Sequence, residues 1–209
     1  MRFRRFVPLG ALVVLMACAG ARVRPDLVYE GTYRSYEKIF DNWTRVGRIY
    51  HYFSTNAIVS ATYFATPMRR AYVSEWGRAF DLPMEERERR LTETTANAAQ
   101  RLEFVVSFYT PTPRYNDLDQ GDSSWRLWFV DGQGTKVEAA KVEPIRVKHE
   151  KDTYFYPTYT DWGRLYRVYF PAVGPDNKPL VAESGTVTLR VTGVEGMTDL
   201  VWQIPPGNS

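Results

Sequence analysis

The chain has 209 residues, enough for one domain that buries roughly 70% of its unfolded surface. Its single cysteine excludes an internal disulfide, so the fold must be stabilised by burial of its core. The formal net charge of +3 includes Arg2, Arg4 and Arg5, and without these three the chain has 24 basic and 24 acidic residues. Without these three arginines, the chain has no excess of basic residues of the kind that is typical of nucleic-acid binding.

The first eighteen residues combine a basic start with a short apolar segment. Residues 7–17 are apolar except for Pro8 and Gly10, and they end in the quartet Leu15-Met16-Ala17-Cys18. This run is too short to span a bilayer, which needs about 20 apolar residues. The pattern indicates a secretory signal that ends at the only cysteine.

The quartet Leu15-Met16-Ala17-Cys18 resembles a bacterial lipobox. The resemblance implies a lipoprotein whose signal peptide, residues 1–17, is removed and whose Cys18 sulfur carries a diacylglyceryl group. Its new amino group is then often acylated as well, for instance with palmitate, and two or three acyl chains anchor a protein stably. Ala19 stands where enterobacteria-like sorting uses Asp to retain a lipoprotein at the inner membrane. The resemblance therefore implies the periplasmic face of the outer membrane. A cleaved secretory peptide with a chance cysteine and a short membrane anchor are the alternatives.

Residues 18–26 are expected to form the lipidated cysteine and a short tether, followed by one domain over 27–206. Eight extended residues reach at most about 28 Å, so the domain should lie close to the membrane. Arg22 and Arg24 could contact anionic lipid headgroups, or the tether could simply be solvated.

The first elements of the domain are predicted as one helix followed by a hairpin. Tyrosine and apolar residues recur at roughly helical spacing over 35–41. Residues 46–53 and 57–65 are rich in β-branched and aromatic side chains and are predicted as two strands joined through 54–56.

Two helices follow as an insertion over about residues 67–100. Thr66 offers an N-cap and Pro67 a first helical residue for a helix over 68–80, with Glu75 inside its otherwise apolar stripe. Pro83 ends this region and introduces a helix over 84–100. That second helix offers only Met84, Leu91, Ala98 and Ala99 for burial, so we expect it to lie on the surface.

The rest of the chain is predicted as strands separated by turns, over 102–109, 124–131, 135–147, 154–159, 164–170, 186–192 and 200–204. Residues 124–131 are apolar on both faces, which favours a central strand covered on both sides. A division near Pro144 is expected within 135–147. The fold class is therefore mainly β: an antiparallel, Ig-like β-sandwich with an inserted helical pair, or alternatively a partly open β-barrel.

Catalytic and metal-binding patterns are sparse. The sequence has no Gly-x-Ser-x-Gly elbow and no paired His or Cys spacing, and it predicts no cofactor. His51 lies in a predicted strand and His149 in a charged turn, neither with a spaced second ligand. A hydrolase assembled from dispersed acids such as Asp117, Asp119 and Asp161 remains the least favoured alternative.

An acidic loop over 116–123 resembles a calcium-binding loop through Asp117, Asp119 and Asp122. An EF-hand closes with a bidentate Glu eleven positions after its first ligand, and that position here is Trp128. An ordinary loop in which these side chains cap their own backbone is the simpler interpretation.

Four aromatic residues are candidates for a sugar-stacking platform: Trp43, Tyr156, Tyr159 and Trp162. Most Trp and Tyr residues of a sandwich instead belong to its core. The leading hypothesis is a lipid-anchored, non-catalytic envelope protein that acts as a structural or assembly partner of another envelope protein and binds no nucleic acid. A glycan- or cation-binding module is the alternative.

Overall fold

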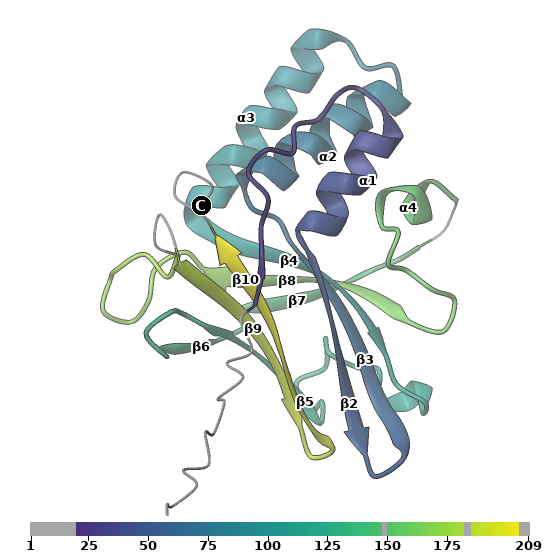
Figure 1. Cartoon of the computed structure of the whole chain (residues 1–209), viewed down its shortest axis with the longest axis vertical. Coiled ribbons are helices and arrows are strands. Elements are labelled where there is room, and N and C mark those ends of the chain that lie inside the picture. Colours follow the sequence, from purple (N-terminus) through teal and green to yellow (C-terminus); the bar gives the residue numbers. More distant parts are fainter. Residues whose placement is uncertain (1–19, 148–149, 182–184, 205–209) are drawn as a thin grey trace, which may run out of the picture.

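The computed structural model describes residues 20–147, 150–181 and 185–204, which form two facing five-stranded sheets with four α-helices gathered at one end (Figure 1). In strand order, the first sheet contains β1 (Ala21–Arg22), β10 (Gly196–Ile204), β9 (Gly185–Gly193), β5 (Trp125–Val130) and β6 (Lys136–Glu138). The second contains β2 (Thr44–His51), β3 (Ser54–Tyr63), β4 (Arg101–Tyr109), β8 (Arg164–Pro171) and β7 (Lys141–Ile145). Among these strands, only β1 and β10 pair in parallel. The predicted antiparallel sandwich with a helical insertion is confirmed, and the described sheets do not close into a barrel.

Alternating side chains from both sheets form the core. Val187, Leu189 and Val191 of β9 are buried, as their alternation predicts. Phe104 of β4 and Trp202 of β10 are fully buried, and their ring centroids lie 5.5 Å apart. These two rings therefore join the two sheets across the core.

The chain passes from the first sheet to the second between β6 and β7. The N–H of Ala139 donates to the carbonyl of Leu127 in β5 at 3.0 Å, and the N–H of Ala140 donates to the carbonyl of Tyr169 in β8 at 2.8 Å. The predicted division near Pro144 is wrong. Pro144 lies within β7, an edge strand, where a missing N–H is tolerated.

Two further expectations about strands need correction. The turn between β2 and β3 falls at Tyr52-Phe53 rather than at 54–56, because β3 begins at Ser54. Strand β5 is not covered equally on its two faces. Its residues Trp125 and Phe129 are buried, whereas Arg126 on the opposite face is exposed.

The inserted helices α2 (Thr66–Ala79) and α3 (Met84–Gln100) connect β3 to β4, as predicted. Helix α2 begins one residue early, with Ala65 as N-cap in place of Thr66. Helix α3 has no buried residue, so it lies on the surface as expected, and Met84 is exposed rather than packed. The helix predicted over 35–41 is α1 (Tyr33–Asn42), which Thr32 caps reciprocally with Ser35.

The predicted strand over 154–159 is wrong, because its first residues belong to helix α4 (Glu150–Phe155). Phe155 is buried, and its ring centroid lies 4.7 Å from that of Trp76 and 5.5 Å from that of Tyr72. Aromatic residues favour strands when they pack on a sheet, but here they pack between helices. Contacts with α2 therefore override the local preference.

Candidate functional site

The segment that follows the predicted lipidation site is already part of the sandwich. Cys18 lies outside the described residues, but Ala21 pairs with Trp202 and Arg22 with Gln203. Arg45 donates to the carbonyl of Ala21 at 2.8 Å and to that of Val201 at 3.0 Å, which ties β1 to both sheets. Within residues 18–26, which were expected to form the lipidated cysteine and a short tether, Ala21 and Arg22 are thus paired with the sandwich. Among the described residues, no helix has the length and apolar composition needed to cross a membrane.

The candidate imidazole and acidic residues do not converge. His51 is exposed at the end of β2, with its Nδ1 3.9 Å from Glu195 Oε2, and His149 lies outside the described residues. Asp161 is exposed in the turn before β8. Among the described residues, His51 is thus near Glu195 and forms no ion pair with Asp117, Asp119 or Asp161.

The acidic loop is organised by its own hydrogen bonds. Asp117 Oδ1 accepts from the Ser123 hydroxyl at 2.7 Å, and Asp119 Oδ2 accepts from the Gln120 amide at 2.7 Å. Within the described parts of the chain, no three acids, histidines or cysteines are grouped as metal ligands. Asp117 and Asp119 are thus hydrogen-bonded to other side chains of the same loop.

The structure does not bring the four candidate aromatic residues together. Trp43 is buried in the core, where its carbonyl accepts from Trp202 Nε1 at 2.8 Å. Tyr156 is also buried, and Tyr159 is half-buried against the core. Trp162 alone is strongly exposed, at 82%. Sequence composition could not separate this residue from the three that pack inward.

Trp162 lies at a groove on the outer face of the second sheet. The groove has a volume of about 490 Å³ and is lined by Ile58, Ser60, Ser107, Tyr109, Thr158, Thr160 and Trp162. Ser60 Oγ is buried and has no hydrogen-bond partner in the described structure. None of these lining residues is acidic or basic. We call this feature the Trp162 groove.

The wall of the Trp162 groove depends on a close approach of backbone to backbone. The N–H of Gly163 donates to the carbonyl of Thr160 at 3.0 Å, which closes the turn that carries Trp162. A Cβ at Gly163 would lie 3.2 Å from the carbonyl oxygen of Phe108 in β4. Glycine therefore lets this turn lie directly on the sheet.

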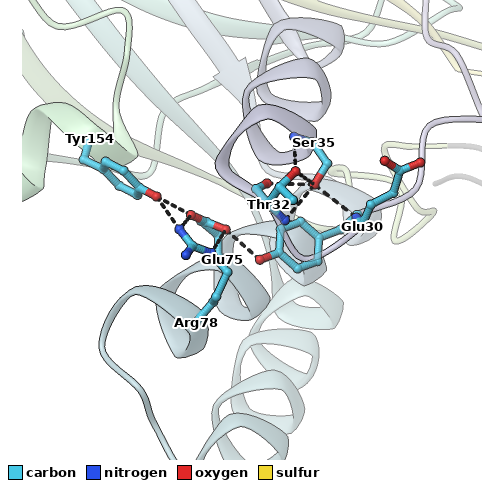
Figure 2. A network of polar contacts seen from close by, with 7 residues as sticks. Glu30, Thr32, Ser35, Glu75, Arg78 and Tyr154 are labelled. Atoms are coloured by element: carbon cyan, nitrogen blue, oxygen red, sulfur yellow. Dashed lines mark hydrogen bonds and ion pairs between the residues drawn. The ribbon is translucent and has the colours of Figure 1, made fainter.

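A second polar site, which the sequence analysis missed, surrounds the carboxylate of Glu75 in α2 (Figure 2). Its Oε2 accepts from Tyr29 OH at 2.6 Å and from Arg78 Nε at 3.0 Å. Its Oε1 accepts from Arg78 Nη2 at 2.5 Å and from Tyr154 OH. We call these four residues the Glu75 network. The sequence signal was an acid inside an apolar stripe, with Arg three residues later.

The Glu75 network holds a buried charge in its ionised form. Burial by itself raises the pKa of Glu75, but hydrogen bonds from Arg78, Tyr154 and Tyr29 outweigh it, and the pKa lies below its usual range. Burial and the bond to Glu75 raise the pKa of Tyr154. A carboxylate that stays ionised at neutral pH and already accepts four hydrogen bonds is a poor general acid or base. The network fits a structural role, joining the segment before α1 to α2 and α4.

A third polar site lies between α2 and the second sheet. The carboxylate of Glu103 in β4 pairs with Arg69 at 2.7 Å and with Arg167 at 3.1 Å. Arg167 Nη2 also donates to Tyr156 OH at 3.0 Å. Because Arg69 is buried and pairs with Glu103, removal of Glu103 would leave the charge of Arg69 without this partner of opposite sign. This site also suits packing rather than catalysis.

Comparison with protein-family models, curated proteins and solved structures found no match. The chemistry of the described residues thus carries the functional assignment. The two buried carboxylates are engaged by donors within the protein, whereas the Trp162 groove presents unengaged aromatic and hydroxyl groups to solvent.

Proposed function

We propose that this protein is a lipid-anchored envelope protein whose sandwich domain is a non-catalytic structural or assembly module. The observation that carries the proposal is the short spacing between the lipobox cysteine, Cys18, and the first paired residue, Ala21. Three residues reach at most about 11 Å. An acylated Cys18 would therefore hold the domain directly at the bilayer surface.

Two further features support a non-catalytic role. The buried acids Glu75 and Glu103 are paired with arginine. In the acidic loop, Asp117 accepts a hydrogen bond from Ser123 of the same loop. The described acids and His51 thus form no arrangement of base, nucleophile and oxyanion donors. A module held at the membrane without its own chemistry would act by positioning or binding another envelope component.

The test is metabolic labelling with palmitate, followed by fractionation of membranes. Cys18→Ser should abolish the label and release the domain from the membrane fraction. A matched variant, Ala19→Asp, should keep the label and move the protein to the inner membrane in an enterobacterial host. A Cys18→Ser protein that remains labelled and membrane-bound would refute the lipid anchor.

The Trp162 groove favours a second candidate function, the binding of a neutral glycan. Its volume of about 490 Å³ lies within the range of about 300–1,000 Å³ that is common for ligand sites. An exposed indole ring stacks on the apolar face of a sugar, and the hydroxyls of Ser107 and Thr160 can donate to and accept from its hydroxyl groups. The absence of acidic and basic residues from the lining favours an uncharged ligand.

Titration calorimetry with neutral oligosaccharides tests this second candidate. Maltohexaose, cellohexaose and chitohexaose are suitable probes. Trp162→Ala should abolish any binding, whereas Tyr52→Ala, which removes another exposed aromatic ring outside the groove, should leave it unchanged. Binding that survives Trp162→Ala would exclude the groove as the site.

A further inference from the structure

The end of the sandwich opposite the helices carries an exposed apolar surface. Two hairpins project there, β2–β3 and β9–β10 (Figure 1). Phe53 is fully exposed at the first turn and Tyr52 is 87% exposed. We define the tip surface as the strongly exposed residues of the two hairpin ends: Tyr50, Tyr52, Phe53, Val194 and Met197.

The two hairpin ends form one continuous surface. Asn56 Nδ2 of the first hairpin donates to Glu195 Oε2 of the second at 2.7 Å. Gly196 lies so close to Ile49 that a Cβ there would approach its Cγ2 to 2.9 Å. Because both contacts join the hairpins beside their turns, the exposed rings and aliphatic groups share one end of the molecule.

The turn of the first hairpin is built to present an aromatic ring. Tyr52 has a φ of 54°, in the left-handed region where Gly or Asn is the usual residue. The chain accepts a strained tyrosine at this position and places Phe53, without cover, beside it. The first hairpin therefore carries an aromatic residue at a turn position that favours Gly or Asn.

The direction of β1 shows from which end of the sandwich the chain enters this strand. Strand β10 begins at Gly196, beside the tip surface, and runs toward the helical end. Because β1 is parallel to β10, the chain enters β1 from the tip side. Ala21 pairs with Trp202, so it lies roughly 20 Å along β10 from Gly196. The three residues from Cys18 to Ala21 can span at most about 11 Å, which is about half of that distance toward the tip surface.

We propose that the tip surface docks on the lipid bilayer that holds the anchor, so that the helices point away from the membrane. This inference rests on the proposed lipidation of Cys18. Tyrosine and phenylalanine are suited to the membrane interface, where an apolar ring can be buried while a phenol hydroxyl stays hydrated. The partner is thus a lipid surface close to the anchor.

The charges at the hairpin ends define the kind of lipid surface. Apart from tyrosines, residues 50–56 and 193–198 contain only His51 and Glu195 as ionisable side chains, and these lie 3.9 Å apart. Without a basic cluster, docking depends on apolar insertion rather than on attraction to anionic headgroups. Docking should therefore occur on phosphatidylcholine and change little with salt.

The experiment uses the mature lipidated protein reconstituted into phosphatidylcholine vesicles. The lipid blocks Cys18, so a cysteine introduced by Phe53→Cys is the only free thiol and can carry an environment-sensitive fluorophore. Spin-labelled lipid should quench this probe several-fold more strongly than the same probe at Glu85→Cys on α3. A second set of variants carries the probe at Met197→Cys. In this background, the double change Tyr52→Ser and Phe53→Ser should weaken quenching by spin-labelled lipid. Trp162→Ser, outside the tip surface, should not weaken it.

The outcomes separate the docking inference from the proposed function. A protein purified without an acyl chain on Cys18, which would not enter the vesicles, refutes the lipid anchor. A protein that enters, but whose probe at position 53 is quenched by aqueous iodide and not by spin-labelled lipid, refutes the docking inference alone. Protection of the probe from both quenchers would mean that a second copy of the chain covers the tip surface. This result would also overturn the docking inference.

Discussion

Replacement of Glu75 by glutamine should destabilise the domain by about 2–3 kcal/mol at neutral pH. Four hydrogen bonds converge on its buried carboxylate, from Tyr29, Tyr154 and twice from Arg78. Hydrogen bonds to a charged group contribute about 1.5–3 kcal/mol each, and glutamine keeps part of this set because it retains one oxygen acceptor. For a domain of this size, the loss corresponds to a fall in melting temperature of roughly 4–12 °C.

The destabilisation caused by Glu75→Gln should become smaller as the pH falls. The unfolded pKa of Glu is about 4.3, and the folded pKa of Glu75 is lower because of its donors. Its carboxylate therefore stabilises the native state fully above about pH 4.3, and the contribution disappears as the pH falls through the folded pKa. The difference between the wild type and Glu75→Gln should thus shrink below about pH 4.

Urea unfolding followed by tryptophan fluorescence measures both effects. Glu88→Gln, at an exposed position of α3, is the matched control and should change the free energy of unfolding by no more than about 0.5 kcal/mol. Tyr154→Phe should cost less in the Glu75→Gln background than in the wild type, because the two residues share a hydrogen bond. If Glu75→Gln were as stable as Glu88→Gln at pH 7, the Glu75 network would not stabilise the fold.

Three other changes test the fold and the loops. Phe104→Ala should lower the free energy of unfolding by about 3–5 kcal/mol in the same urea assay, because the ring is fully buried against Trp202. Gly163→Ala should cost about 1–3 kcal/mol, since the added methyl group crowds the carbonyl of Phe108, and an unchanged midpoint would contradict the close approach. Calcium should not raise the melting temperature, because Asp117 is bonded to Ser123. A site occupied at a hundredfold excess over Kd would instead add about 2.7 kcal/mol, and a rise lost in Asp117→Asn would identify one.

Local patterns predicted the elements whose environment is simple. The alternation of Val187, Leu189 and Val191 identified β9, because one of its faces is packed in the core. The helix formers over 84–100 identified α3, which lies on the surface and is not reshaped by neighbours. In such elements, the period of the sequence and the environment of the chain agree.

Elements that depend on distant partners were not predictable from the sequence. Tyr154 and Phe155 favour sheets and so predict a strand, but the Phe155 ring packs on Trp76 of α2 and the Tyr154 ring on Tyr33 of α1. Strand β1 has only two residues and exists because β10 lies beside it. Among the candidate aromatic residues, Trp43 and Trp162 have the same composition signal but opposite exposure. Three-dimensional contacts decided each of these cases.

The pairing of β1 with β10 has a consequence for the order in which the protein forms. These strands come from opposite ends of the chain, so β1 has no neighbour to join until the last strand has been made and exported. Contacts between such distant segments form late, since a long loop must close first. On the proposed pathway, the segment after Cys18 therefore stays undocked during translocation, and the enzymes that acylate the cysteine meet an accessible chain.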